Sequence, residues 1–441
     1  MAVEPEFEQW QRNPADLQSL SRWVTAMQAQ SREAEAVALL VAVAEKPTDA
    51  LIAAGVYTAL ITLELGQGNT GRAGDWSKRL SEAEPEGFRA PYFRGRILQS
   101  MGRMHDAKAH YLQAAKKEHM HADLWQRLLD CCTVTRDFER ALRILVQVQQ
   151  WSWKPALKRL WRYKQGCIYQ QSTRYSLAMV CFSELILDCV TQGIPTIEPR
   201  PARLSQVAPE APMAALRDAI ALLERHDLQA FPTAGTLLGW WREGKFLSHD
   251  KDIDIMLPPG ADWARAFQLM SEAPAFAAVF NEMNYSNFHS FVHRETKLVV
   301  DISHHEYHDD GQVQCVWRVP GLPDEQCRRT RQSQYALVRD EWFGVQFWRP
   351  EDPGSFLSEL YGDWRTPDTG FDTTISGHHL VGYPDVVRSY AYNRLADRLS
   401  GGSREKGLAY VAQILAKDPL DPIANHINNL FTQVATQSDE G

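Results

Sequence analysis

The sequence predicts a multidomain protein in which a long all-α region precedes an α+β domain and a second, shorter set of helices. Residues from about 15 to 190 carry apolar side chains at helical spacing and no clear strand pattern. Alternating apolar and polar residues, typical of strands, appear at 252–257 and 297–303. We therefore expect helical repeats at 1–190, a proline-rich linker at 191–212, the α+β domain at 213–385, and C-terminal helices and a tail at 386–441.

Small residues recur 34 positions apart in the first region. Gly68 and Gly102 are one such pair, and Ala73, Ala107 and Ala141 form a series with the same spacing. Small side chains let two helices approach closely. The period and these positions resemble the tetratricopeptide (TPR) repeat, which implies a curved solenoid with a surface for a protein partner. An unrelated helical bundle is the alternative. The C-terminal helices either cap the α+β domain or close an interface with these repeats.

Composition narrows the class of protein. The 441 residues carry a net charge of −8, which argues against a dedicated nucleic-acid-binding protein. Seven cysteines, an odd number in a long chain, favour reduced thiols and a cytoplasmic protein. The N-terminal residues do not have the pattern of a signal peptide, and we predict no membrane span.

Two carboxylates mark the centre of the α+β domain. In the segment Asp252-Ile253-Asp254-Ile255, a strand places both aspartates on one face and both isoleucines on the other. Two ionised carboxylates so close repel each other unless a proton or a cation lies between them. Oxygen ligands of this type favour Mg²⁺ or Mn²⁺.

Other residues complete a predicted phosphoryl-transfer site. If the strand at 297–303 lies beside the first, Asp301 supplies a third carboxylate. The segment Gly235-Thr236-Leu237-Leu238-Gly239 provides backbone that a ligand can approach closely. Arg242 and Lys245 follow within reach of phosphate charge. Carboxylates, a metal ion and phosphate-binding donors are the groups that phosphoryl transfer requires.

The same residues resemble a known family. The order GTLLG, Arg242 and Asp250-Lys251-Asp252-Ile253-Asp254, followed by PEDPGSFLSELYGDWRTP at 350–367, is similar to the LicD/fukutin family over about residues 213–385. The resemblance implies a nucleotidyltransferase fold. It also implies transfer of phosphocholine, ribitol phosphate or glycerol phosphate from a CDP-linked donor to a glycan or glycolipid acceptor.

The resemblance also implies roles for residues. Asp252 and Asp254 are the metal pair, Asp301 fits a downstream aspartate, and Tyr361 and Trp364 lie beside the donor pocket. Asp301 could accept the proton of the acceptor hydroxyl, and Asp250 and His249 are alternatives near in sequence. His249 and Lys251 depart from the family pattern, because many relatives have acidic and tryptophan residues there.

Two further segments have alternative interpretations. The residues His304, His305, His308, Cys315 and Cys327 either bind zinc or belong to a histidine-rich hairpin. The residues Arg328, Arg329 and Arg331 either bind phosphate or acceptor, or lie on a solvated loop.

Two other functions use the same sequence features. The first is a nucleotidyltransferase that adds a nucleoside monophosphate to a protein or small molecule through the same carboxylates. The second is a TPR scaffold with an inactive C-terminal domain.

Overall fold

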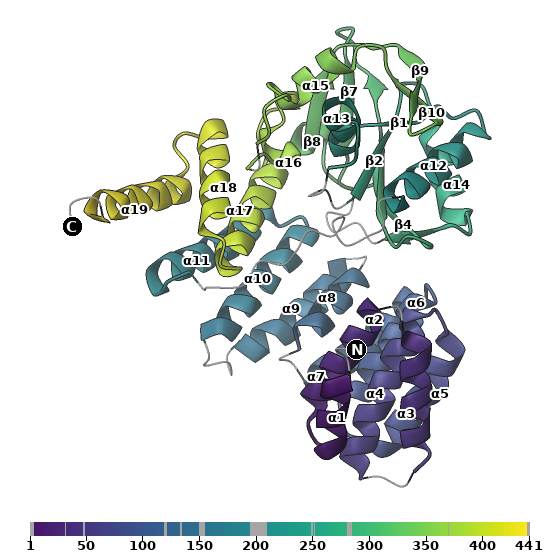
Figure 1. Ribbon diagram of the computed structural model, residues 1–441. Coiled ribbons are helices and arrows are strands. Elements are labelled where there is room, and N and C mark those ends of the chain that lie inside the picture. The colour runs from purple at the N-terminus through teal and green to yellow at the C-terminus, as the bar shows by residue number, and fades with distance from the viewer. Residues whose placement is uncertain are drawn as a thin grey trace. The chain divides into compact units, whose positions relative to one another are not determined.

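The protein is described by a computed structural model that covers residues 4–30, 32–46, 49–118, 121–132, 135–149, 155–194, 210–247, 250, 252–279, 285–368 and 370–438 (Figure 1). Its chain forms two compact units, Met1–Trp161 and Arg162–Gly441. Residues 195–209 of the predicted linker, together with His249 and Lys251, lie outside the described residues.

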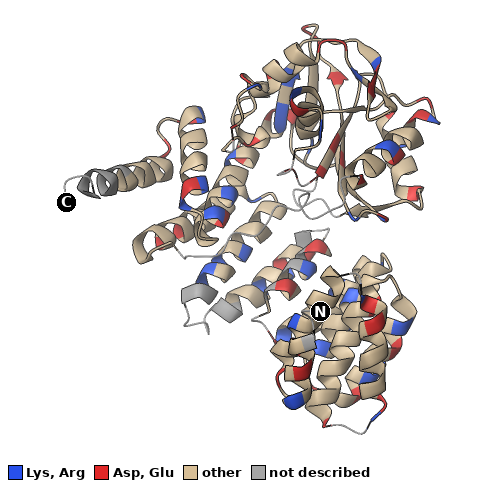
Figure 2. Ribbon diagram, viewed as in Figure 1, with Lys and Arg blue, Asp and Glu red and all other residues tan. Residues whose placement is uncertain are grey.

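The first unit is helical. Its helices are α1 (Glu4–Arg12), α2 (Leu17–Ala29), α3 (Glu33–Ala44), α4 (Ala50–Gly66), α5 (Thr70–Ala83), α6 (Arg89–Ser100), α7 (Met104–Lys117), α8 (Ala122–Asp130) and α9 (Thr135–Gln149), and α10 (Pro155–Gln171) spans the division between the units. Basic and acidic residues are interspersed over the described helices of this unit (Figure 2).

The predicted 34-residue spacing corresponds to a repeated turn. Gly68 and Gly102 have φ of 79° and 75°, which is the left-handed conformation that glycine adopts at low cost. At each turn the next backbone N–H bonds back five residues, from Asn69 to Glu64 at 2.8 Å and from Arg103 to Leu98 at 2.9 Å. Helical hairpins of this kind are compatible with repeats, and assignment to the TPR class remains a prediction.

Close helix contacts explain another small residue. A Cβ added at Gly95 would lie 2.6 Å from the Tyr111 ring, so glycine lets the fully buried tyrosine pack on α6. The same contact recurs in the second unit, where a Cβ at Gly166 would lie 2.5 Å from the Phe182 ring. Each pair is separated by 16 positions, which indicates a common helix-pair geometry.

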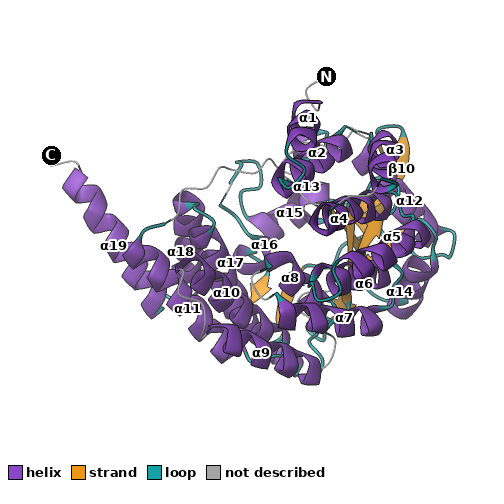
Figure 3. Ribbon diagram, turned by 90° about the horizontal axis from the view of Figure 1, so that it is seen from below, coloured by secondary structure: helices purple, strands orange, loops and turns teal. Residues whose placement is uncertain are grey.

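The second unit contains helices that precede the sheet domain in the sequence and helices that follow it. Helix α11 (Tyr175–Gln192) packs against α17 (Asp385–Ser400), which packs against α18 (Arg404–Lys417), and α19 (Pro422–Ser438) follows (Figures 1 and 3). They share a core that includes Phe182, Leu185 and Leu395. The predicted boundary at residue 190 therefore differs from the structure, which divides at residue 161 and joins α11 to the C-terminal helices.

Helix α11 is long and apolar enough to cross a membrane. Within the described residues it is the one helix that meets this test, and Phe182, Ile186 and Cys189 on it are fully buried against neighbouring helices. In all, 39% of this 18-residue window is buried inside the structure.

The sheet domain is mixed α/β. Its main sheet has the order β1-β2-β5-β4-β3, in which only the β2–β5 pair is parallel among the described strands. A second sheet has the order β11-β8-β7-β6, and β9 and β10 form a hairpin. The strands are β1 (Phe231–Pro232), β2 (Asp252–Leu257), β3 (Phe276–Val279), β4 (Phe288–His293), β5 (Val299–His304), β6 (Glu306–Tyr307), β7 (Val313–Trp317), β8 (Arg328–Gln332), β9 (Leu337–Trp342), β10 (Val345–Pro350) and β11 (Leu380–Val381).

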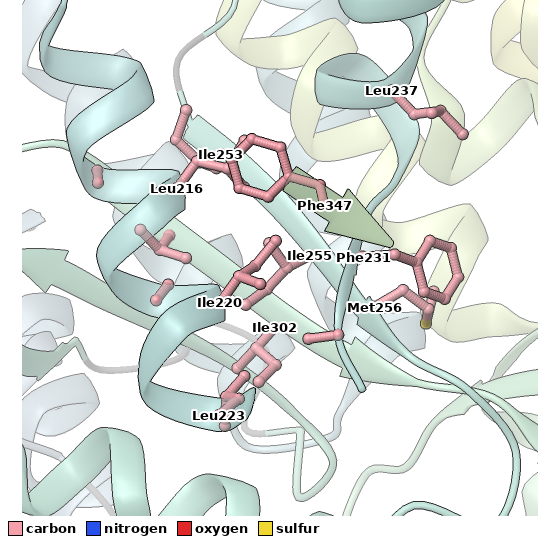
Figure 4. Close-up of a cluster of buried hydrophobic side chains, with 14 of the residues drawn as sticks. Leu216, Ile220, Leu223, Phe231, Leu237, Ile253, Ile255, Met256, Ile302 and Phe347 are labelled. Carbon is pink, nitrogen blue, oxygen red and sulfur yellow. The ribbon is translucent and has the colours of Figure 1, made fainter. Parts of the chain in front are cut away.

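One apolar face of the main sheet anchors the domain. Leu216, Ile220 and Leu223 project from α12 onto Ile255 and Ile302 of the sheet (Figure 4). Successive strand residues face opposite sides of a sheet. Because Ile255 and Ile302 are buried on this face, the residues before them, Asp254 and Asp301, point to the other face. The remaining helices of the domain are α12 (Ala211–Glu224), α13 (Ala234–Glu243), α14 (Trp263–Glu272), α15 (Pro353–Tyr361) and α16 (Thr373–Ser376).

Candidate active site

Strands β2 and β5 bring the predicted carboxylates together. They pair in parallel, with Asp254 opposite Asp301 and Asp252 opposite Val299. Ile253 and Ile255 are buried in the core, while the three aspartates line a cavity of about 910 Å³ on the opposite face. The predicted adjacency of the two strands is confirmed.

The segment before β2 fixes the position of Asp254. The hydroxyl of Thr236 accepts a hydrogen bond from the Asp254 backbone N–H at 2.9 Å, and the Thr233 N–H donates to the Asp254 carbonyl at 3.0 Å. The Gly235 backbone N–H donates to the Asp254 carboxylate. The N-terminal end of α13 therefore holds this strand end and one of its carboxylates.

Gly235 also makes room for a fourth carboxylate. A Cβ at this position would lie 2.4 Å from Oδ2 of Asp250, so any larger residue would displace that side chain. Asp250 lines the cavity with the other three aspartates. The glycine predicted to permit close approach of a ligand thus permits close approach of an acidic side chain.

A serine of the neighbouring strand β4 positions the Asp301 carboxylate. Ser290 lies opposite Asp301 in the antiparallel register and donates a hydrogen bond to its carboxylate. The other oxygen, Oδ1, is buried and has no hydrogen-bond partner among the described residues. A buried oxygen without a partner is costly, and a cation or a donated proton would satisfy it.

Burial and mutual repulsion shift the titration of these groups. Burial, followed by the charges of Asp252, Asp250 and Asp301, raises the pKa of Asp254 well above its usual range. Burial and then the Asp252 charge raise the pKa of Asp301 to about 7. No salt bridge joins Asp254 or Asp301 to a lysine or arginine in the described part of the chain, so protein cations do not offset this repulsion.

The carboxylates fit a metal ion that also takes oxygens from a substrate. The described residues contain no preassembled group of three or more His, Cys, Asp or Glu side chains around a metal-sized point. Mg²⁺ commonly binds one or two protein carboxylates and completes its shell with water and substrate phosphates. An incomplete carboxylate site in a large cavity suits that mode of binding.

Other predicted residues divide into those that line the cavity and those that do not. Arg242, Tyr361 and Trp364 line it together with Gly235. Thr236 is buried behind Asp254, and Lys245 is exposed away from the cavity lining. Gly239 packs on the following loop, since a Cβ there would lie 2.6 Å from the Lys245 carbonyl oxygen.

Arg242 and Tyr361 connect the carboxylates to the rest of the wall. Nη1 of Arg242 donates to the Trp364 carbonyl at 3.2 Å, while its buried Nε has no partner among the described residues. Burial and then the charges of Asp254 and Asp250 raise the pKa of Tyr361 well above its ordinary value. Tyr361 is therefore a neutral phenol close to the acidic group.

The histidine side chains of the segment from His304 to His308 have separate partners. His304 pairs with Glu306 at 3.1 Å, His305 with the Tyr335 hydroxyl at 2.7 Å, and His308 with Asp310 at 2.8 Å. In the described residues they do not gather into a metal site. Strands β6 and β7 of this segment pair antiparallel, as the hairpin interpretation predicts.

The structure adds cavity residues that the sequence did not indicate. Ser290, Tyr390 and Arg394 line the wall, and the last two come from α17, far along the chain. The alternation in β4 was a usable signal for Ser290. No local pattern distinguishes Tyr390 and Arg394 from other helix residues.

Comparison with known proteins agrees with this geometry. The model of the family described as LicD/FKTN/FKRP, nucleotidyltransferase domain, matches residues 227–340, a range that holds the four aspartates and Arg242. No curated protein matches the chain. Residues 227–340 of this chain are a LicD/FKTN/FKRP nucleotidyltransferase domain.

Proposed function

We propose that this protein transfers a phospho-alcohol, such as phosphocholine, ribitol phosphate or glycerol phosphate, from a CDP-linked donor to a hydroxyl of a glycan or glycolipid. The family match supports a transferase of phosphorus-containing groups acting on glycans. The observation that carries the proposal is the facing pair Asp254 and Asp301 in a cavity of about 910 Å³. That volume is in the range of small-molecule and cofactor sites.

Asp252 and Asp254 would hold Mg²⁺ or Mn²⁺, with Asp301 beside them. When bound, the metal ion would offset the negative charge of the donor pyrophosphate. Three observations support a metal ion at this site. The side chains offer only oxygen ligands, the pKa values of Asp254 and Asp301 are raised, and a buried Asp301 oxygen has no partner among the described residues.

The protein residues would position the donor and accept the proton. Arg242, with an unsatisfied Nε at the cavity wall, is suited to a donor phosphate oxygen. The acceptor hydroxyl oxygen would form a bond to the transferred phosphorus while the bond from phosphorus to the CMP oxygen breaks. CMP would leave with the bonding electrons, and Asp301 would take the hydroxyl proton, since its pKa of about 7 suits a general base.

The helical unit and the cellular location belong to the same proposal. We propose that the helical repeats predicted at 1–190 bind a protein partner, because repeat arrays offer extended surfaces. All seven cysteines are free thiols, which supports a reducing cytoplasmic location.

Donor binding tests this proposal without turnover. The melting temperature would be measured with CDP-choline, CDP-ribitol or CDP-glycerol, in the presence of Mg²⁺ or EDTA. A cognate donor at 100 times its Kd should add about 2.7 kcal/mol of stability, and only with the metal. Asp254→Asn should abolish the shift, whereas Asp309→Asn, an exposed aspartate outside the cavity, should retain it. A shift that persists in EDTA and in Asp254→Asn would refute the proposed donor site.

A further inference from the structure

The cavity wall contains a second cluster of charged groups, apart from the aspartates. Arg328, Arg394 and His379 line the same cavity. The Arg328 charge acts on His379, and Asp372 and Tyr390 act on both Arg328 and Arg394. The Asp254 carboxylate is influenced instead by Asp252, Asp250 and Asp301. The wall thus has an acidic part and a second part in which two arginines face one carboxylate, Asp372.

Arg328 is buried without a carboxylate partner. It is 4% exposed on β8, its Nη2 donates to the Thr373 carbonyl at 3.0 Å, and its guanidinium lies 4.1 Å from the Trp317 ring centroid. Among the described residues it forms no salt bridge, and the acceptors of its Nε and Nη2 are the backbone carbonyls of Thr374 and Thr373. A buried guanidinium normally pairs with an anion, because removing it from water is costly.

Arg394 reaches this wall from a helix that follows the sheet domain in the sequence. It lies on α17, with its guanidinium 4.7 Å from the Tyr390 ring centroid, and it hydrogen-bonds the Tyr390 hydroxyl. Asp372 is the acidic group that faces both arginines, but its carboxylate already accepts from the Tyr410 hydroxyl at 2.9 Å and from the Thr374 N–H at 2.9 Å. One carboxylate therefore faces two guanidinium groups.

His379 adds an unsatisfied atom to the cluster. Its Nδ1 is buried and has no hydrogen-bond partner among the described residues. Burial and then the Arg328 charge lower its pKa well below the usual value, so the ring is neutral at pH 7. Tyr285 and Tyr390 line the cavity nearby and provide flat aromatic surface.

We propose that Arg328, Arg394 and His379 form an anion subsite that binds a phosphate group carried by the acceptor, apart from the donor pyrophosphate at the aspartates. The planar guanidinium is suited to bidentate phosphate recognition. This inference rests on the proposed function, because it assigns the acceptor as a phosphorylated or phosphodiester-linked glycan. Arg394 lies beyond the family match at 227–340. Helix α17 therefore supplies part of the specificity for the acceptor.

Binding of simple phosphates to the full-length protein tests the subsite. Isothermal titration with inorganic phosphate and glycerol 3-phosphate would be performed in EDTA, with uncharged glycerol as the control. The wild-type protein and Asp254→Asn should bind both phosphates and not glycerol. Arg328→Gln should weaken phosphate binding at least tenfold. Arg328→Lys should recover only part of that affinity, because lysine keeps the charge but lacks the paired N–H groups of a guanidinium.

The outcomes separate this inference from the donor proposal. Arg394→Gln decides the test if Arg328→Gln is unfolded by thermal melting. No phosphate binding by wild type, or binding that is lost in Asp254→Asn or unchanged in both arginine variants, would overturn the subsite. Because the titration needs neither metal nor turnover, failure of CDP-alcohol transfer would leave the phosphate result interpretable.

Discussion

Asp254 and Asp301 are direct register partners on the parallel strands β2 and β5, and both carboxylates face the same cavity. Burial and then the charge of Asp252 raise the pKa of each. The folded protein therefore holds acidic charge that is unfavourable when no cation is bound. Stability and activity should respond in opposite directions when this charge is removed.

Asp254→Asn should stabilise the metal-free protein at pH 8 while abolishing transfer. A carboxylate whose folded pKa is raised favours the folded state least once pH exceeds that pKa, so stability falls as pH rises from 3.8 through the folded value. The amide removes that loss, and each 1 kcal/mol gained corresponds to ~2–4 °C in melting temperature. Melting curves from pH 5 to 8 in EDTA measure it. A variant with the same pH dependence as wild type would contradict the raised pKa.

Gly235→Ala should reduce activity with little loss of fold. The added Cβ would lie 2.4 Å from Asp250 Oδ2, so it would displace a carboxylate of the site. Initial rates with the cognate donor would measure the effect. Gly74→Ala is the matched control: this helical glycine has open space around it, so alanine should leave activity unchanged and add up to ~1 kcal/mol of stability. Full activity of Gly235→Ala would rule out a role for the Asp250 position.

Glu306→Gln should lower stability at neutral pH and not at strongly acidic pH. Arg318 binds both oxygens of Glu306, at 2.5 and 2.7 Å, and these bonds together with His304 lower the Glu306 pKa from 4.5 to about 2. A depressed pKa contributes stability above pH 4.5 that is lost as pH falls through about 2.

The expected loss for Glu306→Gln at pH 7 is about 1–3 kcal/mol, measured by urea unfolding. The difference from wild type should shrink as the pH is lowered from 4.5 toward 2. Glu325→Gln, an exposed neighbour with no ion pair among the described residues, serves as the control. Equal losses at pH 7 and pH 2.5 for Glu306→Gln would show that the pair is not responsible.

Gly166→Ala should destabilise the second unit by about 1–3 kcal/mol, because the new methyl group would overlap the buried Phe182 ring at 2.5 Å. Since α11 shares a core with α17, we expect α11 and the C-terminal helices α17 and α18 to lose protection together. Hydrogen exchange followed by mass spectrometry would detect this. Loss confined to α10 and α11 would contradict a shared core.

Local patterns in the sequence predicted the centre of the site well. Alternation located β2 and β5, and a buried isoleucine face required the aspartates to share the other face. The segment between these strands depends more on tertiary pairing: α14 ends at Glu272, and Phe276–Val279 forms strand β3. Pro274 limits the helix, and pairing with β4 favours the strand.

Long-range packing was beyond local prediction. The arginines at 328, 329 and 331 lie on strand β8, not on a solvated loop, and pairing with β7 and β11 determines which of them is buried. Helix α11 packs against α17, about two hundred positions away in sequence, and α17 carries Arg394, which lines the cavity. Neither contact leaves a periodic signal.

Identification of the products tests the central claim most directly. The protein would be incubated with the CDP-alcohol that gives the largest thermal shift, Mg²⁺ and a phosphorylated glycan acceptor, and the mixture would be followed by ³¹P NMR. We predict stoichiometric CMP and a new phosphodiester on the acceptor, with neither formed by Asp254→Asn nor in EDTA, and with Asp309→Asn equal to wild type. Release of pyrophosphate from a nucleoside triphosphate with transfer of a nucleotide, or CMP formation that continues in Asp254→Asn, would contradict the account.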